Sequence, residues 1–239
     1  CAGWRNRKNR ARPPLDRFLT TSLTRIGNFD MFTVVLLTSP EIRGLDPSLV
    51  ESLRNAWGGG DAIWLSPDEA AEFSVPDMPV NRWEVWESCQ AMQVDLLVVL
   101  TATRRKKMLL ADMDSTMIQQ ECIDELADEA GVGETVKDIT ARAMNGELDF
   151  DGALRERVGL MKGLDVSVID KVLAERINLM PGSKALLATM KANGGHAALV
   201  SGGFTAFTAK VAAELGFDEN RANTLLVENG VLTGDVRMP

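Results

Sequence analysis

Hydrophobic and polar positions alternate along residues 108–239 in a pattern that predicts strands separated by helices. Residues 108–111 and 197–200 are short apolar runs, and polar residues or glycines follow each of them. Apolar runs of this length with polar boundaries are typical of buried parallel strands. Since amphipathic helices are predicted between them, we expect an α/β domain built on a Rossmann-like parallel sheet.

Four segments between these two runs carry apolar residues at helical spacing. They cover residues 118–130, 136–144, 150–161 and 166–177, with glycine or Asn-Gly at two of the ends. Together they predict a helical cap at about 117–181, inserted in the α/β domain. We expect such a cap to close over the edge of the sheet where a ligand would bind, and to exclude water during a reaction.

The remainder of the chain after the cap continues the α/β pattern. Residues 181–192 predict a helix with Pro181 in its first turn, and residues 204–215 predict another. A hairpin is predicted over 224–233, because Asn-Gly between two apolar segments favours a tight turn.

Residues 31–103 predict a separate small α+β domain of the ferredoxin-like kind. Three strands and two helices are expected there, over 32–37, 47–57, 62–65, 83–92 and 94–100. Trp83 and Trp86 are interpreted as packing residues. Residues 1–30 show no periodicity, and we expect a disordered or mistranslated extension with Met31 as the true start. A transit peptide is the alternative.

Asp112 and Asp114 are the first candidates for chemistry. They follow the run 108–111, at the end of a strand where open α/β sheets bind their ligands. Because side chains alternate along an extended segment, both carboxylates should point one way and Met113 the other. Two close carboxylates favour either a bound divalent cation or a division between nucleophile and proton carrier. Two solvated aspartates at a strand end are the alternative.

Ser201, Gly202 and Gly203 follow the second apolar run in the same way. The serine offers a small hydrogen-bond donor, and the glycines let backbone N–H groups approach an anion near a helix N-terminus. An ordinary strand-to-helix turn is the alternative. The pairing with Asp112 and Asp114 favours an anion site.

These motifs resemble those of the phosphoserine phosphatase family of the haloacid-dehalogenase superfamily. The resemblance is carried by residues 112–116 (Asp-Met-Asp-Ser-Thr), Glu121, Arg157 and residues 200–204 (Val-Ser-Gly-Gly-Phe), and it extends from about Met108 to the end. It implies hydrolysis of O-phospho-L-serine through an aspartyl-phosphate, in the last step of serine biosynthesis. Some members also carry an N-terminal module related to amino-acid-binding regulatory domains.

The resemblance also implies roles for individual residues. Asp112 would be the nucleophile and Asp114 the acid/base, both would bind Mg²⁺, and Ser201 with Gly202 would hold the phosphate. Glu121 and Arg157 would bind the ammonium and carboxylate of phosphoserine, and Met144 and Phe150 would form an apolar wall. For Glu121 the alternative is a residue favoured by the helix dipole. For Arg157 it is a position on a solvated helix face.

The chain departs from the family near its end. Pro239 precedes the region where the family carries a lysine and a Gly-Asp-Gly-x-Asn-Asp segment, and the first residue is Cys1. We therefore expect a fragment of a longer enzyme. Two alternatives remain: a non-catalytic amino-acid-binding or regulatory protein with a degenerate phosphatase body, and a phosphotransferase acting on another small molecule.

Composition narrows the function classes. The net charge is −8, residues 1–30 carry +5 (seven basic and two acidic), and the remainder carries −13 (19 basic and 32 acidic). An acidic body argues against nucleic-acid binding. Three scattered cysteines favour a cytoplasmic protein without disulfides. No apolar run approaches membrane-spanning length, so no membrane partner is expected. A homodimer is left open.

Overall fold

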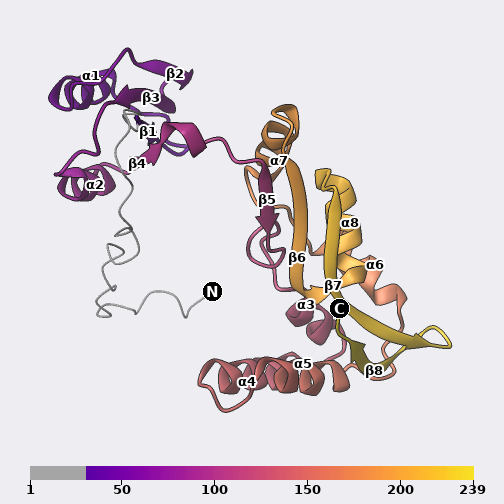
Figure 1. The fold of residues 1–239 in the computed structure, drawn as a ribbon. Helices are drawn as coiled ribbons and strands as arrows, with labels where there is room; N and C mark the ends of the chain where they lie inside the picture. The colour runs from indigo at the N-terminus through magenta and orange to yellow at the C-terminus, as the bar shows by residue number, and fades with distance from the viewer. Residues whose placement is uncertain (1–30) are drawn as a thin grey trace, which may run out of the picture. The chain divides into compact units, whose positions relative to one another are not determined.

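The computed structural model describes residues 31–239, which form two compact units (Figure 1). The first unit ends at Arg104 and the second covers Arg105–Pro239. The expectation for residues 1–30 lies outside the described residues. Each unit has its own buried apolar cluster, so each is described by itself.

The first unit follows the order βαββαβ, which is the ferredoxin-like arrangement. Its elements are β1 (Phe32–Leu37), α1 (Pro47–Ala56), β2 (Ile63–Ser66), β3 (Ala70–Val75), α2 (Arg82–Ala91) and β4 (Asp95–Leu100). The strands form one antiparallel sheet in the order β2-β3-β1-β4. A short 3₁₀ turn, Thr101–Thr103, follows β4.

The expectation of three strands in this unit was wrong, because β3 was missed. Ala71, Phe73 and Val75 point into the core and alternate with Glu72 and Ser74, which is the period of a half-buried strand. Glu72 is only 9% exposed, and it forms an ion pair with Arg104, thirty-two residues later. A partner so distant cannot be inferred from the local pattern.

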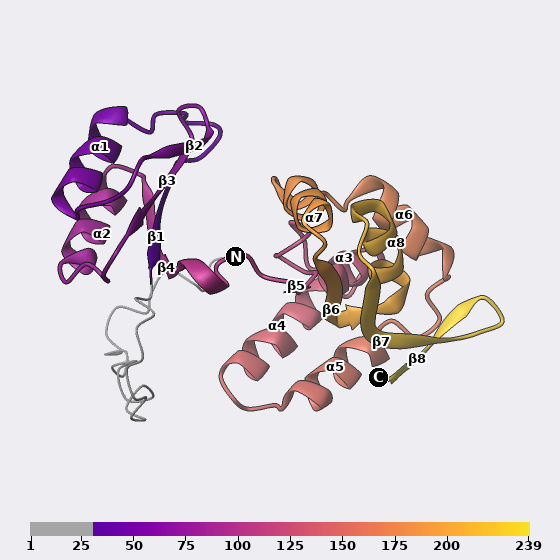
Figure 2. The same cartoon turned by 45° about the horizontal axis from the view of Figure 1, so that its top comes forward.

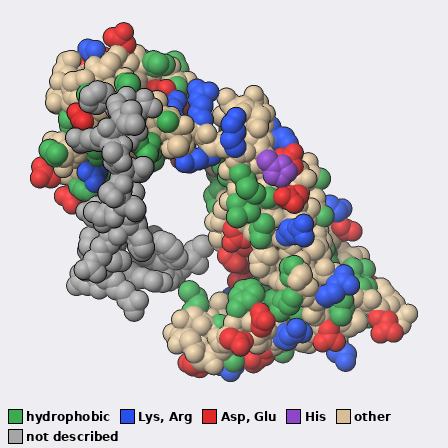
Figure 3. Space-filling model, in the orientation of Figure 1, with side chains coloured by type: hydrophobic (Ala, Val, Ile, Leu, Met, Phe, Trp, Pro, Cys, Tyr) green, Lys and Arg blue, Asp and Glu red, His purple; other side chains and the backbone are tan. Residues whose placement is uncertain are grey.

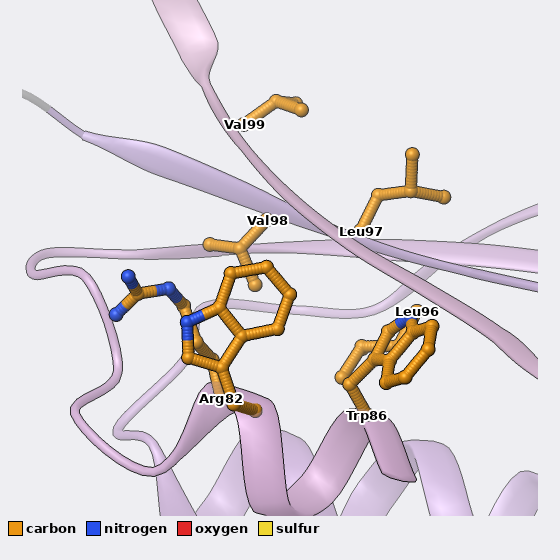
Figure 4. Close-up of a pocket in the computed structure, with 7 residues that line it drawn as sticks. Arg82, Trp86, Leu96, Leu97, Val98 and Val99 are labelled. Carbon is orange, nitrogen blue, oxygen red and sulfur yellow. The ribbon is translucent and has the colours of Figure 1, made fainter. Parts of the chain in front are cut away.

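Trp83 and Trp86 pack edge to face against each other, with ring centres 6.4 Å apart, but they lie outside the buried core of this unit. They are 61% and 39% exposed and line a cavity of about 280 Å³ between α2 and β4. The guanidinium of Arg82 lies 5.3 Å from the centre of the Trp83 ring. Figure 4 shows Leu96 and Val98 pointing toward α2 below the strand. The apolar core of this unit therefore excludes both indoles.

The second unit is an α/β domain around a four-stranded sheet. Its elements are β5 (Met108–Ala111), α3 (Cys122–Glu129), α4 (Gly133–Met144), α5 (Phe150–Gly159), α6 (Ser167–Glu175), α7 (Ser183–Ala192), β6 (His196–Phe204), α8 (Thr205–Leu215), β7 (Glu219–Glu228) and β8 (Val231–Arg237). The sheet order is β5-β6-β7-β8. Strands β5, β6 and β7 are parallel, and β8 pairs antiparallel with β7. The predicted parallel core is confirmed.

Turn chemistry explains where several of these elements begin and end. Gly131 and Gly146 have φ of 72° and 81° just after α3 and α4, a conformation that glycine adopts at low cost. Asn229 and Gly230 join β7 and β8 with φ of 52° and 82°, as a tight hairpin turn requires. The helix expected from Pro181 begins instead at Ser183, because Gly182 takes a left-handed conformation with φ of 87°.

The helices inserted between β5 and β6 differ in what they contact. Helices α4 and α5 lie side by side beyond the carboxyl ends of β5 and β6 (Figures 1 and 2). Helix α6 packs against α3 and also against α8, which covers the sheet. The extent of a movable cap therefore stays a prediction, and α4 with α5 is the pair best placed to form it.

Strand β8 packs against helix α5. The backbone N–H of Gly163 donates to Leu232 O at 2.8 Å, just after the helix ends. Leu232 N–H in turn donates to Leu164 O at 2.8 Å. The hairpin thereby ties the end of α5 to the sheet through β7.

Candidate active site

A pocket of about 230 Å³ opens where β5 and β6 end. Both strands run in the same direction, so their carboxyl ends meet at one edge of the sheet. Ten residues from β5, α3, α5 and β6 or their adjoining turns line it: Asp112, Asp114, Glu121, Ile123, Phe150, Leu154, Arg157, Gly202, Gly203 and Phe204. A pocket of this size suits a small molecule rather than a polymer.

Asp112 and Asp114 both line the pocket, while Met113 between them is fully buried. This is the alternation predicted from sequence. Asp114 Oδ1 accepts the backbone N–H of Cys122 at 2.9 Å, and its Oδ2 accepts the Ser201 hydroxyl at 3.2 Å. Asp112 Oδ1 accepts the backbone N–H of Met113 at 2.7 Å. Within residues 31–239, Asp112 Oδ2 has no hydrogen bond, so this oxygen is the free one.

The turn after β6 depends on glycine. A Cβ on Gly203 would lie 2.8 Å from Asp114 Oδ2 and 3.1 Å from Ser201 Oγ, so a side chain there would displace the aspartate. Gly203 N–H donates to Ser201 Oγ at 2.8 Å. Ser201 does not line the pocket but lies beneath it, 7% exposed, as a link between Asp114 and the turn.

Asn223 on β7 is a contributor that sequence reasoning missed. It is 4% exposed, and its Nδ2 donates to the carbonyl of Gly202 at 2.8 Å. The β6–β7 ladder shifts register between Val200 and Phe204, where this side chain takes part in joining the two strands. Since Asn223 is twenty-one residues from Gly202, no local pattern signals the contact.

Glu121 enters the pocket from the start of α3. Ser115 Oγ donates to Glu121 Oε1 at 2.7 Å. Partial desolvation raises the pKa of Glu121, the Ser115 hydrogen bond opposes that rise, and Asp114, Asp124 and Asp112 add to it through repulsion. The hydroxyl is thus the one neighbour among these that favours the ionised carboxylate.

Arg157 enters the pocket from α5, opposite in charge to Glu121. Its Nε donates to Ala153 O at 3.2 Å and its Nη1 to Thr140 Oγ1 at 3.4 Å. Burial lowers the pKa of the guanidinium, while the carboxylates of Asp124 and Glu121 raise it. The arginine is half-buried rather than on a solvated face.

Phe150 and Met144 were both predicted to form an apolar wall of the site, but only Phe150 lines the pocket. A Cβ on Gly202 would lie 3.0 Å from the Phe150 ring. Met144 is not among the lining residues, since it ends α4 with 76% of its surface exposed. Ile123 and Leu154 supply apolar surface that the sequence analysis did not assign. Both occupy helix positions typical of ordinary core residues, so their spacing alone could not identify them.

Other reactive side chains are excluded from the chemistry of this pocket. Burial and the neighbouring Asp114 raise the pKa of the Cys122 thiol, which therefore stays protonated. His196, the one histidine of the sequence, lies at the opposite end of β6, at the surface beside Asp218 and Glu219 (Figure 3). Neither residue lines the pocket.

No group of three or more histidine, cysteine, aspartate or glutamate side chains within residues 31–239 is arranged to hold a metal ion. None of the helices described there has both the length and the apolar character that crossing a bilayer requires.

A family model described as haloacid dehalogenase-like hydrolase matches residues 109–239. The chain belongs to this family. The match covers the second unit from β5 onward, and therefore includes every lining residue of the pocket. The fold class and the family resemblance predicted from sequence are both confirmed.

Several curated proteins of similar sequence are phosphoserine phosphatases. The phosphoserine phosphatase of Archaeoglobus fulgidus is 48% identical over 137 residues, which is 57% of this chain and 40% of that protein. The chain spans about half the length of the curated relatives it matches.

Two solved structures give the corresponding spatial match. A phosphoserine phosphatase with a phospho-aspartyl intermediate analogue is 44% identical, with a TM-score of 0.52 over 56% of this chain and 64% of that one. A haloacid dehalogenase family hydrolase from Salmonella enterica serovar Typhi is 27% identical, with a TM-score of 0.73 over 88% of this chain and 73% of that one. The second match extends into the N-terminal unit.

Proposed function

We propose that the second unit belongs to a phosphoserine phosphatase, which hydrolyses O-phospho-L-serine through an aspartyl-phosphate. One observation carries the proposal: Glu121 and Arg157, of opposite charge, line the same small pocket as Asp112 and Asp114. Phosphoserine carries an ammonium, a carboxylate and a phosphate, and this pocket offers a suitable partner to each.

The first step assigns Asp112 as the nucleophile. Its unbonded Oδ2 attacks phosphorus, and the bond between phosphorus and the serine oxygen breaks. Asp114 donates a proton to that oxygen, so serine leaves as a neutral alcohol. The different hydrogen bonding of the two carboxylates supports this assignment, because Asp114 is held on both oxygens and Asp112 on one.

The second step reverses the direction of proton transfer. Asp114 removes a proton from a water molecule, whose oxygen attacks phosphorus and releases phosphate from Asp112. Ser201 keeps Asp114 in place through both steps, and Gly202, which lines the pocket, lets the backbone come close to the phosphate. The related structure with a phospho-aspartyl analogue supports this chemistry for its own protein.

Mg²⁺ fits the residues at this site, because carboxylate oxygens are the ligands it prefers. Asp112 and Asp114 would supply two protein ligands, and water or phosphate oxygens would complete the shell, as is usual for this ion. When bound, Mg²⁺ neutralises negative charge on the phosphate and the aspartates. Asp112 and Asp114 themselves carry out the nucleophilic and proton-transfer roles.

Recognition of the amino-acid part is assigned to the helices. Glu121 binds the ammonium, and Arg157 binds the carboxylate through two parallel hydrogen bonds. Phe150 and Leu154 cover the apolar methylene, while closure of α4 and α5 excludes water from the acyl phosphate.

The test measures phosphate release by the whole gene product with Mg²⁺ and three matched esters. Phosphoethanolamine lacks the carboxylate of phosphoserine, and 3-phosphoglycerate has a hydroxyl in place of its ammonium. We expect kcat/KM for phosphoserine to exceed both by at least about 100-fold, since each analogue leaves a charged side chain unpaired.

The nucleophile is tested in the same assay. Asp112→Asn should lower kcat by about a thousandfold or more while the protein stays folded. Near-normal turnover by this variant would reject the aspartyl-phosphate route. Serine binding without any ester hydrolysis by the unaltered protein would favour a non-catalytic regulatory function instead.

A further inference from the structure

The side chain of Arg157 is oriented by hydrogen bonds and not by an ion pair. Its Nε donates to the carbonyl of Ala153 one turn earlier on α5, and its Nη1 donates to the Thr140 hydroxyl on α4. Within residues 31–239, no carboxylate lies within 4.0 Å of its guanidinium nitrogens. Asp124 and Glu121 are close enough only to raise its pKa.

The number of donors on Arg157 limits how a carboxylate can approach. A guanidinium has five N–H donors in one plane. Ala153 uses the one on Nε and Thr140 uses one on Nη1, which leaves one on Nη1 and two on Nη2. A bidentate carboxylate must then bind end-on, across Nη1 and Nη2.

Ala153 blocks side-on binding by occupying Nε, and Thr140 is the second contact that holds the guanidinium in this orientation. The Nε bond to Ala153 is made within α5 itself, so it orients the guanidinium only relative to its own helix. The hydroxyl fixes the plane from a second helix, 17 residues away along the chain. Because it is uncharged, it does not compete with a substrate carboxylate as an aspartate there would.

We propose that Thr140 is a positioning residue that fixes the Arg157 guanidinium for end-on binding of the substrate carboxylate. The inference rests on the proposed function and adds a residue that does not line the pocket. It also links α4 to substrate choice, because the side chain that orients the arginine belongs to that helix.

The experiment compares Thr140→Val, Thr140→Ser and the control Thr135→Val in the whole gene product. Valine keeps the shape of threonine and removes the hydroxyl, and serine keeps the hydroxyl. Thr135 is exposed on the same helix, so its replacement reports the general effect of valine in α4. KM and kcat are measured with phosphoserine and with phosphoethanolamine.

We expect Thr140→Val to raise KM for phosphoserine about 5- to 10-fold, with kcat within about twofold of the unaltered protein. Its KM for phosphoethanolamine should not change, because that ester has no carboxylate. Thr140→Ser and Thr135→Val should behave like the unaltered protein with both esters. If Thr140→Val does not fold, Thr140→Ala takes its place with the same expectations.

Two results overturn the inference while leaving the proposed function intact. One is an unchanged KM for phosphoserine in Thr140→Val, and the other is an equal rise with both esters. Failure of the proposed function is separate, since the unaltered protein would then not prefer phosphoserine at all.

Discussion

Ser115 Oγ donates a hydrogen bond of 2.7 Å to Glu121 Oε1, six residues ahead of it. Ser115 holds this position with a backbone φ of 51°, which is uncommon for a residue other than glycine. A strained backbone and a side-chain contact at the edge of a pocket point to a functional arrangement. The contact favours the ionised form of the residue assigned to the substrate ammonium.

Removal of the Ser115 hydroxyl should shift the pH dependence of substrate binding. Its hydrogen bond opposes the raised pKa of Glu121, so Ser115→Gly and Ser115→Ala should both raise that pKa further. KM for phosphoserine, measured as the pH is lowered, should begin to rise at a higher pH in both variants. Ala should also lose about 1 kcal/mol of stability relative to Gly, because it tolerates a positive φ poorly. Superimposable pH profiles would show that the contact does not tune Glu121.

Glu121→Gln should raise stability at neutral pH while weakening phosphoserine binding. The pKa of Glu121 is raised in the folded state, so the folded protein holds this proton more tightly than the unfolded chain does. Stability contributed by this group is therefore lost as the pH rises from its unfolded to its folded pKa.

The measurement is Tm against pH for both proteins. The variant and the unaltered protein should match below the unfolded pKa, and the variant should melt higher above the folded pKa. Gln can still accept the Ser115 hydrogen bond, so that contact is kept. A variant that melts lower at neutral pH contradicts the assignment of the raised pKa.

Gly203→Ala should be far more damaging than Gly202→Ala. A Cβ at Gly203 meets Asp114 Oδ2 at 2.8 Å, and that oxygen is held by Ser201. A Cβ at Gly202 meets the Phe150 ring at 3.0 Å, and this ring is 58% exposed and free to turn away. We expect kcat to fall by about 100-fold or more in the first variant and KM to change severalfold in the second. Equal losses in phosphate-release assays would argue against a fixed Asp114.

The Glu72–Arg104 pair should stabilise the first unit only as a pair. Their side chains are 12% and 18% exposed, so removal of one charge leaves the other poorly solvated. Glu72→Gln alone should cost about 2 kcal/mol in urea unfolding, and the double change Glu72→Gln with Arg104→Met should recover part of it. Additive losses would mean that the two charges do not interact.

The sequence by itself determined strand β5 with its two aspartates, the order of elements around it and the family. Short apolar runs followed by Asp112, Asp114 and Ser201 predicted that these three polar residues lie at the ends of strands. Strand ends and turns can be predicted in this way because they are local features. The helices between β5 and β6 and the β7–β8 hairpin followed from spacing and turn residues in the same way. Those patterns need only a few neighbouring positions.

Only the tertiary structure decided which side chains meet. The contacts of Glu72 with Arg104, Asn223 with Gly202, and Thr140 with Arg157 join residues 17 to 32 positions apart. It also left Met144 outside the pocket and the indoles of Trp83 and Trp86 outside the core. Periodicity gives the direction of a side chain from its own element. Hydrogen bonds and buried charges are instead satisfied by whichever distant element packs there, and that is a property of the folded chain.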